Sequence, residues 1–532
     1  MLSAFPIFYS ALSHLIAYGT VTLIGYIVAL CVYRVFFHPL AKYPGPLSYK
    51  LSGWPLLWQA YTGDRHIWHL LDHERYGPIV RIAPNTLSFN TTTALNAIYG
   101  TRTANVKKGE WYKTFDIAAG TYSSFTETDR EKHAIKRRWM SPAFTTESIK
   151  ANEPLIIDII ERFCETLKPN SGGWGDKWNA HLVSVYLGFD LMGALVLGSD
   201  LRSVQEKDNR DLAECVLPTQ KLLYWLSYLP VAFLVRPFLR SQWFEVLGGK
   251  PVRDSNRLID YGKDQVQARL TSNARNETGF KDRIDLLSKL TFNEDKKSGW
   301  RPSSLDLDTE SLNMMLAGAD PYSQVLSGAI FYLVHNPNCL EKVTAEIRST
   351  FASSQEIVSG AKLNSCTYLY ACIEESLRRL TGVLSHVPRV VLSGGMTIDS
   401  HFFSEGTVVG VAQYAIHHNA DYFTEPFKFS PERWIPSPTN PPSAIDEMRR
   451  AFEPFGLGVR GCIGKNLGYL QLKLTLAHFL WRFDLRECEG EKGVGAGRKG
   501  LGIGREREDE YQMWDALGGV RDGPIVEVKS AR

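Results

Sequence analysis

The longest apolar run of the chain lies near its N-terminal end. No Asp, Glu, Lys or Arg occurs between Met1 and Tyr33, and the stretch from Leu15 to Tyr33 is predominantly apolar. A helix of about 20 apolar residues crosses a bilayer. This length favours a membrane span over a buried core helix, and a cleaved signal peptide would have a shorter apolar core behind a basic segment. We therefore expect residues 1–34 to form a membrane anchor.

Cations, prolines and a glycine follow the apolar run. Arg34, Lys42 and Lys50 come first among the cations, and positive charge after a span keeps that side in the cytoplasm. In the segment FFHPLAKYPGP, three prolines and a glycine prevent the helix from continuing. We expect a stiff hinge at 35–50 and one catalytic domain at 51–532.

The hydrophobic residues after the hinge follow two patterns, one typical of strands and one typical of helices. Short alternating runs at 79–82 and 86–89 predict a small sheet. The stretch 309–335 is long, apolar and rich in small residues, as expected for a helix that crosses a core. At 467–481, apolar residues recur every three or four positions, which is typical of a helix. The pattern predicts a mainly α fold with a small β region.

The segment 217–247 is very apolar and rich in aromatic residues. Pro230 and Pro237 interrupt it, so it is not a second span. Three interpretations stay open: the segment lines an access channel, it touches the membrane surface, or it belongs to the core.

Composition and charge narrow the classes of function. Of 532 residues, 44% are hydrophobic and 22% charged, as in an ordinary enzyme with an added apolar segment. The formal net charge of +3 is too balanced to suggest a nucleic-acid partner. The eight cysteines are scattered without a CxxC pair, which fits a reducing compartment rather than a disulfide framework.

A glycine-rich loop, FGLGVRGCIG, comes just before the 467–481 helix and contains Cys462 two residues after Arg460. The free N–H groups at a helix N-terminus favour an anion and lower the pKa of a thiol. The glycines allow the backbone to approach a flat ligand closely. A lone cysteine in such a place is usually a buried structural residue, but the spacing of the glycines and the arginine favours a ligand-binding thiolate here.

This loop resembles the haem loop of the cytochrome P450 family, whose pattern is Phe-x-x-Gly-x-Arg-x-Cys-x-Gly. The resemblance implies a cytochrome P450 fold with an N-terminal transmembrane helix and bound haem b (iron protoporphyrin IX). Cys462 would be the axial ligand of the iron, where a thiolate favours O–O cleavage, and Gly456 would lie beside the haem. The pattern is matched by Phe455, Gly458, Arg460, Cys462 and Gly464.

Further basic residues correspond to the groups that bind the haem propionates in this family. His133 and Arg137 lie at i and i+4, on one face of a helix. Arg389 occupies the position of a propionate-binding arginine on a strand, and Arg460 adds a fourth group. On other faces of the first helix, Lys132, Lys136 and Arg138 would form a basic docking surface for an acidic electron donor.

The 309–335 helix resembles the oxygen-activating helix of the family, where Ala-Gly-x-Asp/Glu-Thr is usual. Residues 317–320 match, but Pro321 occupies the place of the threonine. Since proline has no N–H and clashes with the carbonyl of Ala317, we expect a kink. Asp320 and Ser323 are then the candidate catalytic groups for proton delivery, and we expect slow or poorly coupled oxygen activation.

The sequence also contains the charged residues that, in this family, stabilise the fold behind the haem. Glu375 and Arg378 lie at i and i+3, and Arg433 lies in a later proline-bounded loop. In the family these residues form a buried triad. The aromatic loop at 106–126, the side chains of Leu384 and Val387, and a terminal hairpin would surround the substrate.

Three other motifs carry no chemistry in this interpretation. His417 and His418 are adjacent, which is unsuitable for one metal site on a strand. The GxGxxG run at 495–500 does not open a helix in a βαβ unit. The sequons at Asn90 and Asn276 stay unglycosylated if the body faces the cytosol.

No segment resembles a flavin or nicotinamide domain, so the resemblance implies a separate NADPH–cytochrome P450 reductase, with cytochrome b5 as a further candidate partner. The expected location is the endoplasmic reticulum membrane, single-pass, with the catalytic domain in the cytosol. The expected function is haem-dependent monooxygenation of a lipophilic small molecule with O2, in fungal secondary-metabolite biosynthesis, because the hinge resembles that of microsomal fungal members.

Two alternatives stay open. One is a haem-thiolate enzyme without net oxygen insertion, such as a dehydratase, isomerase or peroxide user, which Pro321 motivates and a requirement for NADPH and reductase would exclude. The other is a non-enzymatic membrane haem protein, against which a substrate-induced spin change would count.

Overall fold

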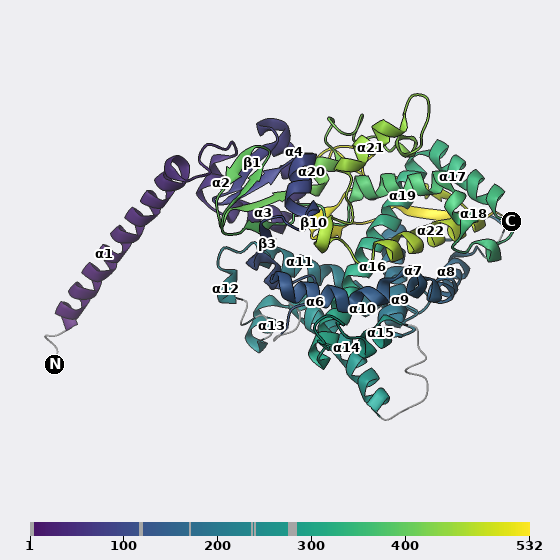
Figure 1. Cartoon of the computed structure of the whole chain (residues 1–532), viewed down its shortest axis with the longest axis horizontal. Coiled ribbons are helices and arrows are strands. Elements are labelled where there is room, and N and C mark those ends of the chain that lie inside the picture. The colour runs from purple at the N-terminus through teal and green to yellow at the C-terminus, as the bar shows by residue number, and fades with distance from the viewer. Residues whose placement is uncertain are drawn as a thin grey trace.

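The N-terminal helix α1 (Phe5–Val32) projects from the body of the protein (Figure 1). The computed structural model describes residues 5–115, 121–169, 172–235, 238, 241–274 and 285–531. Residues 12–37 have a mean hydropathy of 2.2 and none of them is buried, as a membrane span requires. The predicted N-terminal apolar helix is therefore confirmed. A second apolar stretch, Ala180–Leu197, is mostly buried and belongs to the core.

The hinge after α1 is fastened to the body by Arg81. Its guanidinium donates to the carbonyl of Arg34 at 2.8 Å, and its N–H donates to the carbonyl of Pro44 at 2.7 Å. At Gly45, a Cβ atom would lie 2.3 Å from the carbonyl oxygen of Arg81, so only glycine permits this approach. These contacts fix the direction in which the chain enters the body.

The β region is a five-stranded sheet close to the hinge. Its order is β1 (Ile79–Ala83), β2 (Thr86–Phe89), β8 (Val408–Val411), β5 (Arg389–Val391) and β3 (Val106–Lys108). Strands β2 and β8 are parallel, and the other neighbours are antiparallel. The strands predicted at 79–82 and 86–89 are confirmed. The pairing of β3 with β5 places Lys108 opposite Arg389.

The long helix α16 (Ser304–His335) crosses the centre of the molecule (Figure 1). A capping box between Ser303 and Asp306 begins it. On its way it packs against α9 (Ala180–Met192), α14 (Lys250–Ala274), α19 (Thr367–Leu380) and α22 (Lys465–Arg482).

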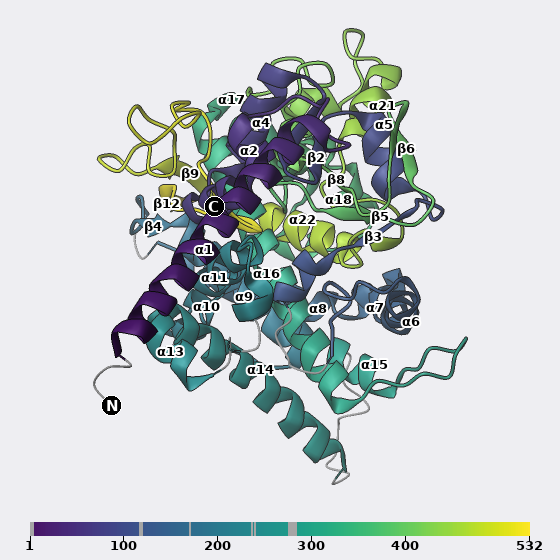
Figure 2. The same cartoon turned by 90° about the vertical axis from the view of Figure 1, so that its left-hand side faces the viewer.

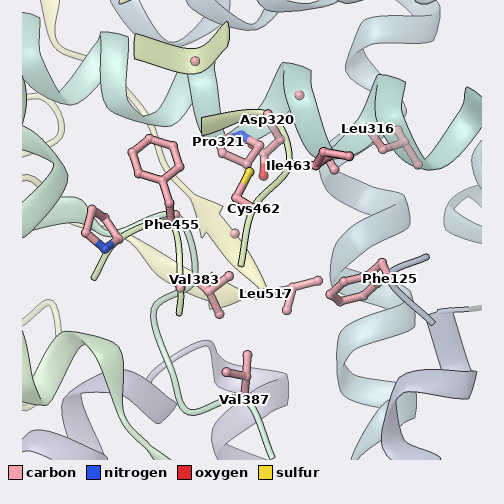
Figure 3. A pocket seen from close by; sticks show the side chains of 18 of the residues that line it. Phe125, Leu316, Asp320, Pro321, Val383, Val387, Phe455, Cys462, Ile463 and Leu517 are labelled. Atoms are coloured by element: carbon pink, nitrogen blue, oxygen red, sulfur yellow. The ribbon is translucent and has the colours of Figure 1, made fainter. Parts of the chain in front are cut away.

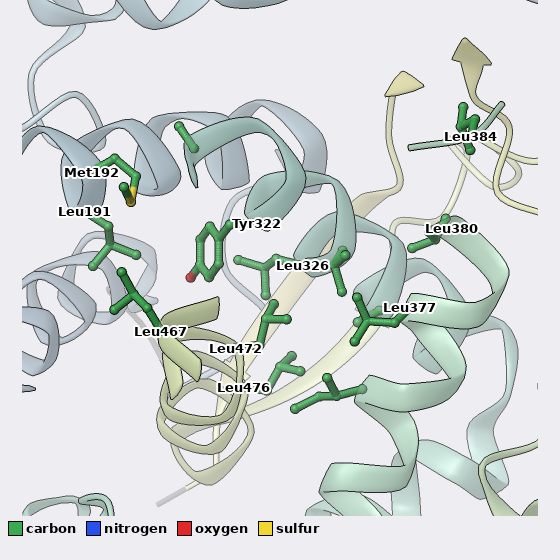
Figure 4. Packing of buried hydrophobic residues seen from close by; sticks show 14 of the residues in the cluster. Leu191, Met192, Tyr322, Leu326, Leu377, Leu380, Leu384, Leu467, Leu472 and Leu476 are labelled. Atoms are coloured by element: carbon green, nitrogen blue, oxygen red, sulfur yellow. The ribbon is translucent and has the colours of Figure 1, made fainter. Parts of the chain in front are cut away.

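Figure 4 shows part of the core around α16, with Tyr322 and Leu326 from that helix facing Leu467 and Leu472 of α22. The close packing of α9 depends on Gly188, because a Cβ atom there would lie 2.7 Å from the carbonyl oxygen of Ala319.

Other elements surround this core. The helices before α16 are α2 (Leu47–Leu51), α3 (Trp54–Thr62), α4 (Arg65–Tyr76), α5 (Thr92–Leu95), α6 (Arg130–Met140), α7 (Thr146–Ala151), α8 (Glu153–Leu167), α10 (Arg210–Glu214), α11 (Val216–Ser227), α12 (Ala232–Val235), α13 (Gln242–Gly248) and α15 (Leu286–Phe292). Those after it are α17 (Pro337–Thr350), α18 (Ala361–Ser365), α20 (Gln413–His417) and α21 (Pro442–Ala451). The remaining strands pair as β4 (Trp178–Asn179) with β12 (Ile525–Ser530) and β9 (Phe483–Glu487), β6 (Met396–Ile398) with β7 (His401–Phe403), and β10 (Trp514–Ala516) with β11 (Gly518–Val520).

The apolar segment 217–247 has two different environments. Helix α11 packs against the body and contributes to the wall of the internal cavity. Helix α13 instead exposes Trp243, Val246 and Leu247, which are 81%, 76% and 84% accessible. Both α12 and α13 lie on the side of the body from which α1 projects (Figures 1 and 2). Pro237 and the predicted sequon at Asn276 lie outside the described residues.

Candidate functional site

A cavity of about 440 Å³ lies between the middle of α16 and the loop that precedes α22. Figure 3 shows Cys462 on one side, with its sulfur pointing toward Pro321 and Asp320 on the other. Helix α11 and the hairpin β10–β11 complete the wall. Most side chains of the wall are apolar, among them Phe125, Leu316, Val383, Val387, Ile463 and Leu517.

The loop that carries Cys462 needs glycine at two positions. Gly456 and Gly458 have φ angles of 67° and 63°, which favour glycine. A Cβ atom on Gly458 would also lie 2.3 Å from the carbonyl oxygen of Tyr99. The N–H of Cys462 donates to the carbonyl of Phe455 at 2.8 Å. The loop is thus folded tightly, and Phe455 and Gly456 line the cavity beside the thiol.

The Cys462 side chain is accessible from the cavity but enclosed by protein. Burial raises the pKa of its thiol, and the N–H groups of Gly464 and Lys465 together with Arg137 lower that pKa only in part. The expectation that the helix terminus lowers this pKa overall is therefore wrong for the protein alone, because desolvation of the thiolate outweighs the helix terminus. A bound metal cation would favour the thiolate.

Basic side chains gather at one edge of the cavity. The predicted Arg389 and Arg460 line it together with Lys108, which sequence reasoning missed. His133 and Arg137 do not line the cavity but lie next to it on α6, where the Arg137 guanidinium donates to a backbone carbonyl of the Cys462 loop at 2.7 Å. The sequence around Lys108 does not reveal this position, because only the pairing of β3 with β5 brings Lys108 to this edge of the cavity.

These basic groups bond to neutral acceptors. Lys108 and Arg460 donate to the backbone carbonyls of Phe125 and Glu127, at 2.6 and 2.8 Å, and Arg389 donates to the hydroxyl of Tyr112. Within the described ranges, none of them forms an ion pair with a carboxylate.

The protein alone leaves this cluster with uncompensated positive charge. Burial, followed by repulsion from Arg389, lowers the pKa of Arg460 to about 10. Burial lowers the pKa of His133 to about 2, with Arg460 and Lys108 contributing, and it lowers the pKa of Lys108 well below its ordinary value. Buried cations are normally paired, so the cluster fits an anionic ligand with more than one carboxylate. The two propionates of haem meet that requirement, and the thiol of Cys462 fits the iron.

Asp320 faces the cavity from α16, and its charge is balanced by Arg521, which lies just after β11. The two side chains form an ion pair at 3.0 Å, and both are buried. Arg521 also donates to the hydroxyl of Ser323 at 2.6 Å. Ser323 itself lies behind Asp320 and does not line the cavity. Sequence reasoning missed Arg521, because no local pattern connects positions 201 residues apart.

Helix α16 continues through Pro321 without interruption. The missing N–H leaves the carbonyl of Ala317, which lines the cavity, without its helical donor. The next residue, Tyr322, does not replace the threonine hydroxyl, because its own hydroxyl is hydrogen-bonded to Thr475 of α22 at 2.7 Å. The predicted kink stays a prediction.

The predicted Glu375–Arg378–Arg433 triad is assembled and buried. Arg378 donates to both carboxylate oxygens of Glu375 at 2.7 and 2.9 Å, and Arg433 donates at 3.1 Å. The N–H of Ser430 and the indole of Trp434 add two further hydrogen bonds. Burial alone raises the pKa of Glu375, but Arg378 and Arg433 lower it to about 2. Glu375 is therefore a fully bonded carboxylate.

The predicted basic docking surface on α6 is wrong for Lys136, which is buried and pairs with Asp306 of α16 at 2.9 Å. Arg138 is exposed but donates twice to the carboxylate of Asp295, at 2.7 and 2.8 Å. Lys132 is exposed and has no ion pair in the described part of the chain. The acidic partners come from distant segments, so the helix sequence does not reveal them.

Several pocket predictions are confirmed and one is wrong. Phe125 and Val387 line the cavity, as does Leu517 at the tip of the terminal hairpin. Tyr112 and Phe115 of the aromatic loop also line it, while residues 116–120 of that loop lie outside the described residues. Leu384 is fully buried in the core instead.

Of the motifs set aside in the sequence, the structure places the histidine pair and the glycine run, and the histidines do not lie on the expected strand. His418 bonds to the carbonyl of Tyr414 through its ring, and His417 accepts from the N–H of Glu453. No metal-binding group of His, Cys, Asp and Glu occurs in the described residues. The two histidines end a short helix, α20, rather than lying on a strand. The glycine run at 495–500 lies between β9 and β10 and opens no helix.

Comparison with known proteins gives one consistent result. The family model described as Cytochrome P450 matches residues 48–504. The relatives include cytochrome P450 monooxygenase fscF of Fusarium equiseti, 34% identical over 95% of this chain and 94% of the relative. They also include cytochrome P450 monooxygenase AKT7 of Alternaria alternata, 32% identical over 96% of each chain. Cytochrome P450 monooxygenase apf7 of Gibberella fujikuroi is 33% identical over 94% of this chain and 96% of the relative.

Proposed function

Since the chain belongs to the cytochrome P450 family and is a haem-dependent monooxygenase, we propose that it oxidises a lipophilic small molecule of fungal secondary metabolism. The haem-loop resemblance and the mainly helical fold predicted from the sequence are confirmed. The alternatives without oxygen insertion or without catalysis are not favoured, because the relatives are named monooxygenases. The observation that carries the proposal is the thiol of Cys462 facing an apolar cavity edged by uncompensated cations.

The haem would be held by residues of this chain on two sides. Cys462 would ligate the iron, and Phe455 and Gly456 would lie against the ring. Arg137, Arg389 and Arg460 would neutralise the propionates, with His133 and Lys108, whose charged forms the propionates would favour, as further donors; the absence of carboxylate partners for these groups in the described ranges supports this. When bound, haem supplies the activation of O2 from which one oxygen atom enters the substrate.

Asp320 would hold and transfer the proton that oxygen activation consumes, at its Oδ2 atom. Its Oδ1 is fixed by Arg521, whereas Oδ2 is buried without a hydrogen-bond partner. Ser323 accepts from Arg521 and donates to the backbone carbonyl of Asp320 at 2.8 Å. Ser323 thus contributes by holding Arg521 and Asp320 in place.

The family uses a redox partner and, in general, a lipophilic substrate. The finer proposal is that electrons come from an NADPH–cytochrome P450 reductase, with cytochrome b5 as a second donor. Two exposed lysines flank the cysteine loop and are suited to acidic partners: Lys132 on α6 and Lys465 at the start of α22. They would act together with the exposed Arg138, whereas the buried Lys136 would take no part.

The N-terminal apolar helix is suited to anchoring the protein in a membrane. We place it as a single span in the endoplasmic reticulum, with the catalytic domain in the cytosol, because Arg34 and Lys42 follow the helix. The exposed apolar side chains of α13 would then dip into the same membrane surface.

The test is spectroscopic and then catalytic. Membranes that contain the full chain are reduced and exposed to CO, and we expect the absorption band of a thiolate-ligated haem. The Cys462→Ala variant should lack that band. The Cys488→Ala variant is the control and should keep the band, because Cys488 is buried outside the cavity wall. With added reductase and a ligand that gives a spin shift, product should require both NADPH and O2. A normal thiolate band in Cys462→Ala would contradict the proposed ligand, and product formed without NADPH would contradict the proposed reaction.

A further inference from the structure

The wall of the cavity contains a group of polar atoms that the protein itself does not satisfy. Thr219 and Gln220 on α11 and Asp320 on α16 all line the cavity. Thr219 Oγ1, Gln220 Oε1 and Asp320 Oδ2 are buried atoms without a hydrogen-bond partner. We call these three atoms the polar corner. Thr219 and Asp320 are 2% and 3% exposed, so bulk water does not solvate their side chains.

These atoms remain unsatisfied although partners are close by. Threonine in a helix commonly donates to the carbonyl four residues back, but Thr219 makes no such bond. Asp320 directs Oδ1 to Arg521 and leaves Oδ2 without a partner. Because an unmade hydrogen bond of a buried polar group is costly, most such groups in folded proteins have partners. Finding three of them in one cavity wall indicates a position for a ligand.

The hairpin β10–β11 brings two of the three atoms, Asp320 Oδ2 and Gln220 Oε1, to one place. A Cβ atom on Gly518 would lie 2.2 Å from Asp320 Oδ2 and 3.5 Å from Gln220 Oε1. The two oxygens therefore border the same glycine, and Thr219 is the neighbour of Gln220 on α11. Leu517, next to Gly518, points into the cavity (Figure 3). The corner is thus a polar part of a largely apolar wall, separate in sequence from the basic edge formed by Lys108, Arg389 and Arg460.

We propose that the polar corner binds a hydrogen-bond donor of the substrate, so that the substrate is a neutral lipophilic molecule carrying a hydroxyl or N–H group. This rests on the proposed function. The amide oxygen of Gln220 only accepts, Asp320 Oδ2 accepts while its carboxylate is ionised, before it takes up the proton of oxygen activation, and only the threonine hydroxyl can also donate. A donor on the substrate therefore satisfies them, whereas a carbonyl or ether oxygen does not.

The charge of the corner selects a neutral group. Asp320 is already paired with Arg521, and both side chains are buried. A substrate carboxylate would be repelled by Asp320, and a substrate ammonium would add a charge that nothing balances. Binding at the corner would fix which carbon of the substrate faces the haem that Cys462 would hold, since the corner and the thiol lie on different walls of the cavity.

The experiment uses the haem-loaded full chain and three probes of nearly equal shape: 1-adamantanol, 1-methoxyadamantane and adamantane. Their dissociation constants are measured from ligand-induced spin-state spectra, without turnover. We expect 1-adamantanol to bind about tenfold more tightly than the other two, the effect of one added hydrogen bond at a buried site. Thr219→Val and Gln220→Leu each keep the side-chain shape, and their combination should abolish the preference.

The control variant is Leu223→Met, on the same helix and in the same cavity wall. It should shift the three dissociation constants together and keep the preference for the alcohol. Equal binding of the three probes to the wild type would overturn the proposal, because water alone would then satisfy the corner. A preference that survives in the double variant would overturn it as well. The CO spectrum of each variant separates these outcomes from failure of the haem site, which would remove the thiolate band.

Discussion

Glu375 and its partner Arg378 form hydrogen bonds to two distant segments. Its carboxylate accepts from Arg378 on its own helix, and from Ser430, Arg433 and Trp434 in the loop that includes the short helix Pro431–Trp434. The same Arg378 donates to the carbonyl of His417 at 2.7 Å. One buried side chain thereby joins α19 to the segment that leads to the cysteine loop.

We expect Glu375→Ala to destabilise the protein by about 3–5 kcal/mol, because it leaves two buried arginines without their counterion. The measurements are urea unfolding and the haem content of the purified protein, both of which should fall. Glu432→Ala is the matched control: Glu432 pairs with Lys342 at an exposed site, so its loss should cost less than about 1 kcal/mol. A normal haem content in Glu375→Ala would contradict the assigned role.

His73 shows how burial makes stability depend on pH. Its ring bonds to the carbonyl of Gly77 and to Ser88 Oγ, both at 2.9 Å, and burial lowers its pKa to about 4. The unfolded chain, with an ordinary pKa near 6.5, therefore binds more protons than the folded one below that value.

Stability should fall as pH decreases from about 6.5 to 4, by up to roughly 3 kcal/mol from this residue. The measurement is the free energy of unfolding of the wild type and of His73→Gln across this range. The variant, which cannot titrate, should show a shallower decline. If the free energy of unfolding had the same pH dependence in both proteins, His73 would take up its proton in the folded protein as readily as in the unfolded chain.

At the scale of the element, α16 combines a proline with a fixed acid. Pro321 removes the hydroxyl and the N–H that a threonine would supply at the cavity, and the Asp320–Arg521 pair holds the adjacent carboxylate. In the proposed mechanism the proton would therefore come from a carboxylate whose rotation is restricted. That restriction is the physical reason to expect poor coupling of electron use to product.

We expect Pro321→Thr to raise the ratio of product formed to NADPH consumed, because it restores both a hydroxyl and a helical hydrogen bond. Coupling is measured with reductase and a turned-over ligand. Pro321→Ala restores only the N–H and is the control that separates the two effects. Tight coupling in the wild type, unchanged by Pro321→Thr, would exclude this explanation.

The Asp320–Arg521 pair should behave as one unit. Arg521→Gln leaves Asp320 buried without a counterion and should cost about 3–5 kcal/mol, and Asp320→Asn should cost a similar amount. The double variant should be more stable than the sum of the single losses predicts, with a coupling energy of about 1–3 kcal/mol in the unfolding free energies. Additive losses would show that the two side chains do not interact.

Predictions from the sequence were correct where the interacting residues lie close together in the chain, and they failed where the residues lie far apart. The cysteine loop and the Glu375–Arg378 pair lie within one motif or one helical turn, so they could be predicted. The ion pairs that bury Lys136 and fix Asp320 join segments far apart in the chain, and neither partner has a local pattern. The uncompensated charge at Lys108 depends on strand register, which alternation alone does not give.

At the scale of the whole molecule, exposed apolar side chains occur not only on α1 but also on neighbouring parts of the body. Trp243, Val246 and Leu247 are exposed on α13, and Trp58 is exposed on α3. These side chains supply apolar area that a membrane interface would bury.

We expect a chain lacking residues 1–33 to fold and still to associate with lipid vesicles. Replacement of Trp243, Val246 and Leu247 by serine in that shortened chain should release it. Association is measured by flotation with phosphatidylcholine vesicles. The control replaces the exposed Glu206, Lys207 and Asp208 by serine in the same shortened chain. If the shortened chain does not associate with vesicles even without the serine replacements, α1 alone would account for membrane contact.

The large separation of Asp320 and Arg521 in the sequence also has a consequence for biosynthesis. The ribosome completes α16 before it adds the β10–β11 hairpin, so Asp320 is made without its counterion. The buried ion pair, and the part of the cavity wall that the hairpin forms, can therefore assemble only after Arg521 has been synthesised.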